Sequence, residues 1–319
     1  MPNVSNQSEK TIYRVRNWSS YNQSLINRGN IRLWFDASVA ELWYDQRPCE
    51  AGGQYVYSDF CIEAILMLRS VFSLSLRASE GFCQGLVDLM GLDLAVPSYT
   101  QLSRRAAGLS IDLSLPSDNR PIDLVVDSTG VKVYGEGEWK VRKHGYSKRR
   151  TWRKLHLGID PLTGMCHAQV LTDNGVGSGD GQQLKDLLDQ VNQPIKRVAG
   201  DGAYDSFEIW QMLEKRQIAG LIPPAENAVY WVDEEENLLN LERNDILACI
   251  DRSSRKEWKQ SSGYHMRSMA ENGMYRYKTL FGASLKSRKD KQQQIEAFIN
   301  IKCMNKMTEM GMPISVKVA

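Results

Sequence analysis

Apolar residues recur every three or four positions along much of the first third of the chain, which is the spacing of an amphipathic helix. This pattern predicts a helix over residues 59–76 and another over residues 79–90, which Gly91 ends. A third helix is expected to start at Ser98, because Ser98 and Gln101 stand at the spacing of a capping box. This part of the chain is therefore predicted to be a mainly helical module.

The segment before these helices follows a different pattern. Residues 1–20 are polar and are expected to be loose. Apolar residues then alternate at Ile31, Leu33 and Phe35, which predicts a short strand that ends at Asp36.

Apolar runs typical of buried strands follow a Pro-containing linker. The first run covers residues 122–126 and is expected to end at Asp127, before a turn at residues 128–130. Two further runs, residues 153–160 and 165–173, form a predicted antiparallel pair.

Helices and strands are expected to alternate from there on. A helix over residues 182–190 precedes a short strand that ends at Asp201, and a helix over about residues 204–216 precedes a last strand at residues 220–224. Such alternation predicts an α/β domain. Residues 225–262 are interpreted as an insertion. The later residues 264–278 and 292–307 have helical spacing, the second with one packed and one solvated face.

Composition limits the class of protein. The 319 residues are 42% hydrophobic and 24% charged with a net charge of +2, which is ordinary for a soluble globular protein. The six cysteines form no C-x-x-C pair, so neither structural zinc nor a disulfide framework is expected. The polar N-terminus lacks the apolar stretch of a signal peptide, and no apolar run is long enough to span a membrane. We expect a cytoplasmic, nucleoid-associated protein.

Two predicted strands end in an aspartate that a small residue follows. Ligands of α/β folds bind beyond strand ends, so Asp127 and Asp201 are candidate site residues, and Glu271 completes a carboxylate triad. Magnesium prefers oxygen ligands, and two Mg²⁺ ions can stabilise the attacking and leaving oxygens of a phosphoryl transfer. Asp123 shares the strand with Asp127, but a solvated position at the strand start explains it better.

One stripe of the helix at residues 264–278 supports this interpretation. At about 100° per residue, the side chains of Tyr264, Arg267, Glu271 and Lys278 fall close to one line. A salt-bridged helix surface is the alternative, since Arg and Glu four residues apart are common. The two strand-end aspartates favour a site in which Glu271 binds metal and the cations beside it hold phosphates.

Other residues with candidate chemistry have simpler explanations. His156 and His167 fall within predicted strands without a ligand partner at a recognisable spacing, so packed or hydrogen-bonded histidines are expected. The glycine-rich residues 174–181 match no phosphate-binding motif and are expected to lead into a helix that Asp180 caps. Asp205 is expected to support the start of the next helix.

Two segments have the composition of nucleic-acid contacts. Residues 139–154 are the densest basic stretch and contain interleaved aromatic rings, with Arg149 and Arg150 as candidate DNA contacts. The polar helix after Ser98 follows another helix and a short break, as in a helix-turn-helix, with Arg104 and Arg105 as candidate contacts. A solvated hairpin turn and two ordinary connected helices are the respective alternatives.

The spacing Tyr264-x₂-Arg267-x₃-Glu271-x₆-Lys278 resembles the Tyr-Arg-Glu-Lys signature of bacterial DDE insertion-sequence transposases. The sequences DSTG at Asp127 and DGAYDS at Asp201 are similar to the regions that hold the first two acids of that family. The fuller pattern GYHMRSMAENGMYRYKTLFG is similar to the insertion-sequence-five (IS-five) group.

This resemblance implies a ribonuclease H-like catalytic core: three antiparallel strands, then helices alternating with parallel strands. Asp127, Asp201 and Glu271 would bind two Mg²⁺ ions, with Mn²⁺ able to take their place, and Tyr264, Arg267 and Lys278 would position DNA. The implied partners are double-stranded DNA, as terminal inverted repeats and target, and further copies of the chain on paired ends.

Three parts of the chain are expected on this basis. They are a mainly helical, helix-turn-helix-like DNA-binding module with a loose tail (residues 1–118), the catalytic domain with its insertion at about 225–262 (residues 119–283), and a C-terminal helix and tail (residues 284–319).

Three functions are compatible with the sequence. The first is a DNA transposase that nicks the element's ends and joins the freed 3′-hydroxyl to target DNA. The second is a ribonuclease H-like nuclease or resolvase without strand transfer. The third is a catalytically silent DNA-binding regulator derived from a transposase, which the presence of all three acids disfavours.

Overall fold

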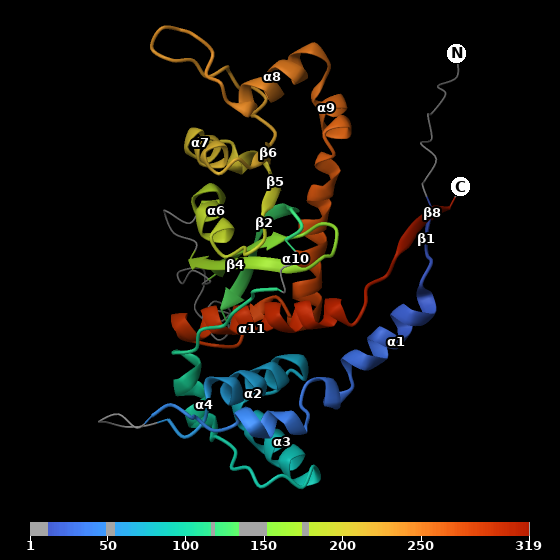
Figure 1. Cartoon of the computed structure of the whole chain (residues 1–319), viewed down its shortest axis with the longest axis vertical. Coiled ribbons are helices and arrows are strands. Elements are labelled where there is room, and N and C mark those ends of the chain that lie inside the picture. The colour runs from blue at the N-terminus through green and yellow to red at the C-terminus, as the bar shows by residue number, and fades with distance from the viewer. Residues whose placement is uncertain (1–11, 49–54, 116–118, 134–151, 174–178, 319) are drawn as a thin grey trace, which may run out of the picture.

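The computed structural model describes residues 12–48, 55–115, 119–133, 152–173 and 179–318. In Figure 1 a sheet with its flanking helices occupies the upper part of the molecule, and helices from the first third of the chain lie below it. One long helix, α11 (Asp290–Glu309), runs between these two parts.

The central sheet is mixed, as the family resemblance implies. Its main strands are β2 (Ile122–Val133), β3 (Trp152–Ile159), β4 (Cys166–Asp173), β5 (Ile195–Ala199) and β6 (Ala219–Leu221). In the order β4-β3-β2-β5-β6, the first three strands are antiparallel, and β5 and β6 run parallel to β2. The expected helices α6 (Asp180–Leu188) and α7 (Phe207–Lys215) connect β4 to β5 and β5 to β6.

Strand β2 is longer than its sequence predicts. The expected end at Asp127 is wrong, because β3 pairs with β2 as far as Lys132, and the short β7 (Ser284–Leu285) pairs with its far end. The predicted turn contains Gly130, where a Cβ would lie 3.3 Å from the ring of Trp152. This glycine therefore permits close packing within the strand and makes no turn.

The helical module contains the three predicted helices. They are α2 (Asp59–Val71), α3 (Leu76–Leu89) and α4 (Tyr99–Ala106). Gly91 follows α3 with a positive φ of 64°, and the capping box of Ser98 and Gln101 is present. These starts and stops were predictable because they depend on side chains within a few residues of each helix end.

The strand predicted over residues 31–36 is wrong. The chain there forms two short 3₁₀ helices, η1 (Ile31–Leu33) and η2 (Ala37–Leu42). The side chains of Asn30 and Asp36 accept backbone hydrogen bonds at their starts, a local arrangement that competes with extended structure.

The expectation of a loose start is wrong for its described part. Strand β1 (Ile12–Val15) pairs antiparallel with β8 (Ser315–Val318), so segments near the two ends of the chain lie side by side. Helix α1 (Trp18–Arg28) follows, and Figure 1 shows it at the side of the molecule. This pairing joins residues about three hundred positions apart, which no local pattern predicts.

The residues interpreted as an insertion pack onto the core of the sheet. They contain α8 (Glu242–Arg252) and α9 (Arg255–Ser261), whose Ile246 and Trp258 are buried in the cluster around β2 and β5. Next come the 3₁₀ helix η4 (Tyr264–Arg267) and α10 (Ser268–Phe281). The single helix predicted over residues 264–278 is thus divided at Ser268.

Helix α11 is buried on two sides, which corrects the expected solvated face. Ile299 and Cys303 pack with the helical module, whereas Ala297 and Ile301 pack with residues of β2, β3 and α10. At 20 residues it is the longest described helix, and none of the helices in the described ranges is long and apolar enough to cross a lipid bilayer. The helical module and the sheet therefore share one helix in their cores.

A glycine in α10 permits its close contact with β3. A Cβ on Gly273 would lie 2.1 Å from Cδ1 of the buried Ile159. We expect Gly273→Ala to destabilise the protein, because overpacking costs about 1–3 kcal/mol and the gain in helix propensity is at most about 1 kcal/mol. Gly81→Ala in α3, where nothing lies within 4 Å, is the matched control and should stabilise it. Denaturant unfolding measures both, and equal gains would contradict the packing argument.

Candidate active site

Asp127 and Asp201 lie near each other at one edge of the sheet. Asp127 is midway along β2, and β5 pairs with β2 only as far as Val125 and Ala199. If that register continued for two residues, Asp201 would stand beside Asp127. The Asp201 carboxylate accepts a hydrogen bond from the Ala203 amide at 2.9 Å, which fixes the turn after β5.

Arg267 connects the first of these acids to Glu271. Its Nη1 donates to Asp127 Oδ2 at 3.1 Å, and its Nη2 donates to Glu271 Oε1 at 2.9 Å. Arg267 ends η4, and Glu271 follows one turn later in α10. The contact between α10 and β2 therefore brings a helical carboxylate to the same site as a strand carboxylate.

Burial and charge act together on Asp127. Its side chain is 20% exposed, whereas that of Glu271 is 62% exposed. Burial raises the pKa of Asp127 above its ordinary value of 3.8, and the negative charges of Asp201 and Asp180 raise it further. The Ser128 amide and the Arg267 guanidinium lower this pKa but do not outweigh the other effects.

Asp180 is a fourth carboxylate near the site, where its charge acts on Asp127. Its sequence position predicted a helix cap and did not predict this location. Its expected capping role is wrong, because Gly179 occupies the cap of α6 and makes no side-chain cap bond. Lys154 Nζ lies 2.9 Å from the carboxylate, and the ring of His156 lies 3.2 Å from it. Burial acts to raise the pKa of Asp180, but hydrogen bonds from His156, Ser128 and Lys154 outweigh it and lower the pKa.

A buried phenol also faces this group of charges. Tyr204, in the 3₁₀ helix η3 (Gly202–Tyr204), is 1% exposed, and its hydroxyl has no hydrogen-bond partner among the described residues. Burial raises the pKa of Tyr204, and the charges of Asp180, Asp127 and Asp201 raise it further. The sequence DGAYDS contains this tyrosine, but only the fold reveals that it is buried beside the carboxylates.

Tyr264 and Lys278 lie at different depths. The Tyr264 ring is buried against Trp258, with centroids 5.7 Å apart, and burial raises its pKa. Lys278 is half-buried two turns beyond Glu271 on α10, about 10 Å along the helix axis. Within the described residues its ammonium makes no hydrogen bond or ion pair, so this cation is available for a ligand.

The cations proposed as further DNA contacts differ in their surroundings. Arg104 is exposed on α4. Arg105 is 11% exposed at its side chain, pairs with Asp59 at 2.6 Å and donates to the Tyr57 carbonyl at 2.7 Å. Arg149 and Arg150 lie outside the described residues.

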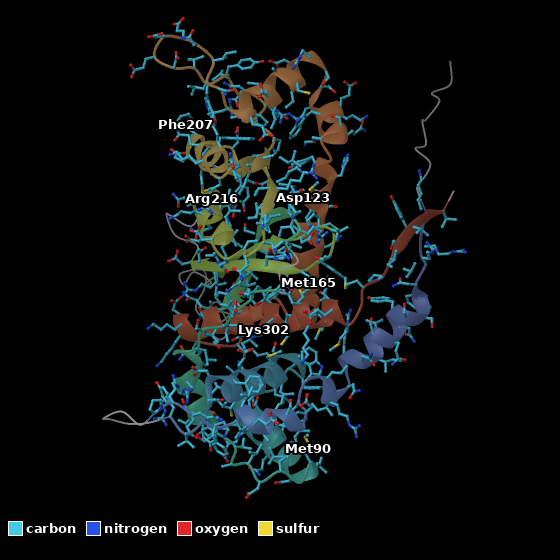
Figure 2. The ribbon with its side chains drawn as sticks, in the orientation of Figure 1. Met90, Asp123, Met165, Phe207, Arg216 and Lys302 are labelled. Atoms are coloured by element: carbon cyan, nitrogen blue, oxygen red, sulfur yellow. The ribbon has the colours of Figure 1, made fainter. Side chains whose placement is uncertain are left out.

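Several charged or polar residues have structural partners instead. Asp205 and Arg243 form an ion pair at 2.8 Å in which both side chains are 5% exposed. Asp123, which Figure 2 labels, pairs with Arg197 at 2.5 Å. His156 and His167 are buried, and His156 contacts Thr172 at 3.1 Å, which agrees with the expectation of packed or hydrogen-bonded histidines.

The donor chemistry of the site fits a hard divalent cation, although its present spacing does not. Carboxylate oxygens from Asp127, Asp201 and Glu271 are ligands that Mg²⁺ prefers. Within the described ranges, however, no three Asp, Glu, His or Cys side chains stand close enough to hold a metal ion. The Arg267 guanidinium lies between two of the carboxylates and supplies the positive charge there.

Fold and site together define an α/β protein with acidic side chains gathered at one edge of a mixed sheet. The family model described as "Transposase DDE domain" matches residues 118–306, more than half of the chain, and a second model of the same description matches residues 26–136. The chain therefore belongs to the DDE transposase family and is a transposase. The particular insertion-sequence family stays a prediction.

Solved transposase structures are also similar to this chain at low sequence identity. A piggyBac transposase synaptic complex with hairpin DNA matches with a TM-score of 0.38 and 13% identity, over 89% of this chain and 73% of that one. The Drosophila P element transposase strand transfer complex matches with a TM-score of 0.31 and 10% identity, over 90% and 86%. A pre-cleavage Mos1 transpososome matches with a TM-score of 0.23 and 11% identity, over 84% and 83%. The family assignment depends on the domain matches alone.

The raised pKa of Asp127 leads to a prediction about stability. Far below pH 3.8 the carboxyl is protonated in folded and unfolded chains alike, so it has no effect there. As pH rises through 3.8 and then through the raised pKa, ionisation costs more in the folded state, and stability falls. We expect Asp127→Asn to raise the Tm at about pH 7 and to lose this advantage at about pH 3. Thermal unfolding measures both, with the exposed Asp186→Asn as control; a lower Tm for Asp127→Asn at neutral pH would contradict the prediction.

Proposed function

We propose that this transposase nicks the ends of an insertion sequence and joins the freed 3′-hydroxyl to target DNA. The observation that carries the proposal is the pair of ion contacts from Arg267 to Asp127 and Glu271. They unite acids from a central strand and a late helix, inside the segment that matches the DDE domain. The strand order, with three antiparallel strands before the parallel ones, supports a ribonuclease H-like core.

Asp127, Asp201 and Glu271 would hold the divalent ions, Mg²⁺ or Mn²⁺. When bound, such ions stabilise charge on the attacking and leaving oxygens of a phosphoryl transfer. The chain itself supplies a half-buried carboxylate, Asp127, whose pKa is raised by burial and by neighbouring acids. Bringing positive charge to it is therefore favourable.

Positioning of DNA is assigned to the cations around this edge. Lys278 has no protein partner among the described residues, so it is the best-supported phosphate contact, and Arg267 and Tyr264 border the same carboxylates. The helical module would bind double-stranded DNA through α3 and α4 in the manner of a helix-turn-helix, with Arg104 on its exposed side. Arg105 contributes less, because Asp59 already neutralises it. Pairing of two ends requires more than one copy of the chain.

The first test of this proposal removes the charge of one acid. Asp127→Asn should abolish cleavage of plasmid DNA that carries the element's ends in the presence of Mg²⁺, while the variant stays folded. Removal of a metal-binding carboxylate costs transition-state stabilisation directly. Asp186→Asn, an exposed aspartate of α6, should cleave as the wild type does. Undiminished cleavage by Asp127→Asn would contradict the proposed role.

Analysis of the products separates transposition from simple cleavage. Joined DNA molecules after incubation with Mg²⁺, end-bearing DNA and target plasmid support strand transfer. Cleaved but never joined products would identify a nuclease or resolvase. If the wild-type protein binds the end DNA but cleaves none of it, the protein is a DNA-binding regulator.

Replacement of Lys278 tests the DNA contact separately from the chemistry. Lys278→Ala should weaken binding of duplex end DNA and reduce the slope of log K against log salt concentration by about 1, as expected for one lost phosphate contact. Its Tm should not change, since the ammonium makes no ion pair among the described residues. Lys215→Ala on α7 is the matched control, and equal binding by both variants would argue against this role.

A further inference from the structure

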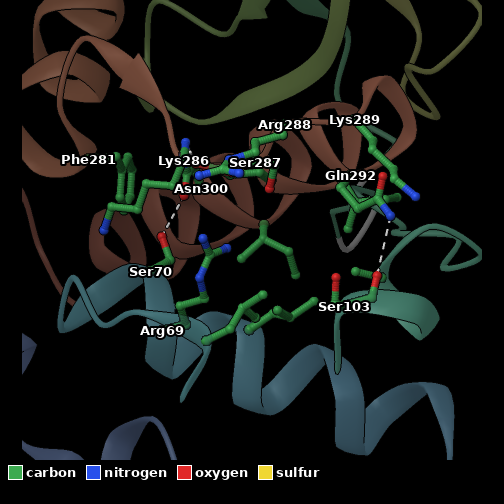
Figure 3. Close-up of a pocket in the computed structure, with 16 residues that line it drawn as sticks. Arg69, Ser70, Ser103, Phe281, Lys286, Ser287, Arg288, Lys289, Gln292 and Asn300 are labelled. Carbon is green, nitrogen blue, oxygen red and sulfur yellow. Dashed lines mark hydrogen bonds between the residues drawn. The ribbon is translucent and has the colours of Figure 1, made fainter. Parts of the chain in front are cut away.

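A pocket of about 320 Å³ lies where the helical module meets α11. It opens between α2, α4 and the segment that leads from β7 into α11 (Figure 3). Its walls include the apolar side chains of Leu66, Phe281 and Ile299. A volume of this size, with an apolar wall on one part and polar or charged groups on the rest, is large enough for a small molecule.

Four cations line this pocket, together with a single carboxylate, Glu296. The cations are Arg69, Lys286, Arg288 and Lys289. Within the described part of the chain none of their side chains makes a hydrogen bond or an ion pair, and Arg69 Nε is buried without a partner. Figure 3 shows Arg69 rising from α2 toward the segment that carries the other three.

The one carboxylate that lines the pocket, Glu296, is outnumbered by the four cations and is held by backbone amides. Glu296 uses one oxygen to accept the Lys286 amide and the other to accept the Ser287 amide, both at 2.7 Å. Nearby Asp290 pairs with Arg153 at 2.7 Å. Burial lowers the pKa of Lys286 and the positive charge of Arg69 lowers it further, while the negative charge of Glu296 opposes both without outweighing them. Two half-buried cations that repel each other are costly to maintain unless an anion binds between them.

We propose that this pocket binds an organic phosphate, with Arg69 and Lys286 on the phosphate group and the apolar wall against the rest of the ligand. Arginine and lysine are the side chains that bind phosphate oxygens most strongly, and Leu66, Phe281 and Ile299 offer a surface for a nucleoside-sized body. The phosphate belongs either to a free nucleotide or to a nucleotide of a DNA strand.

The pocket is connected to the candidate active site through α10. Phe281 ends this helix at the pocket, and Glu271 lies ten residues earlier, about 15 Å along the helix axis. A ligand here would contact α2, α4, α10 and α11 together. Binding would therefore stabilise the contact between the helical module and the catalytic sheet.

Binding is tested on the full chain in EDTA, so that strand cleavage plays no part. The probes are inorganic phosphate, adenosine monophosphate and a duplex oligonucleotide, followed by calorimetry and by thermal unfolding. The wild type should bind adenosine monophosphate more tightly than inorganic phosphate, and its Tm should rise with ligand. Arg69→Gln and Lys286→Gln should each weaken this binding by about tenfold, the effect of losing one charge-assisted hydrogen bond.

Two matched controls separate this site from general loss of charge. Arg32→Gln and Lys215→Gln remove exposed cations outside the pocket and should bind as the wild type does. Without ligand, Lys286→Gln should be at least as stable as the wild type, because the repulsion from Arg69 is relieved. If Lys286 had a merely structural role, its replacement by Gln would instead lower the Tm of the ligand-free protein.

The pattern of results identifies the ligand source or overturns the proposal. Loss of nucleotide binding in the pocket variants identifies a free nucleotide. Duplex binding weakened only in these two variants, without nucleotide binding by the wild type, identifies a DNA phosphate. Equal binding by all five proteins, or equal losses in the controls, would reject the site. Nucleotide binding is measured in EDTA and needs no strand cleavage, so a failure of the proposed catalysis is distinguishable from a failure here.

Discussion

Like charges at the sheet edge are the constraint on which the rest of the site depends. The negative charges of Asp201 and Asp180 raise the pKa of Asp127, and such a group of acids is stable in a fold only where positive charge lies close by. Arg267 supplies that charge for Asp127 and Glu271, and Lys154 supplies it for Asp180. These cations therefore offset the repulsion among the acids in the folded chain.

The position of these acids depends on how two late helices pack. Helix α10 contacts β2 and β3 closely because Gly273 has no side chain, and this contact presents Glu271 to the edge where Asp127 lies. Helix α11 is buried between the sheet and the helical module, so the two parts share one core. Helix α10 also contacts α2 of the helical module and borders the pocket at Phe281.

Cations in this nearly neutral chain fall into two groups. Those of the first group form ion pairs within the protein, as in the buried pair of Arg243 with Asp205 and the pair of Arg105 with Asp59. Cations of the second group, among them Lys278, Arg69 and Lys286, have no partner within the described ranges. Anion binding is proposed at cations of this second group, which a net charge of +2 conceals.

Local side-chain patterns were enough to predict the helices of the module and the capping box at Ser98, because each depends on neighbours within a few residues. The order of antiparallel and parallel strands was implied by the family resemblance, and the catalytic roles of Asp127 and Asp201 stay predictions. Partners distant in sequence decided the remaining features. Pairing with β3 extended β2 past its predicted end, and packing on both sides buried α11. Tertiary structure also decided the ion contacts of Arg267, the ion pair of Arg105 with Asp59 and the cationic pocket. Each joins residues that are distant in the sequence, whereas periodicity describes only residues that are close along the chain.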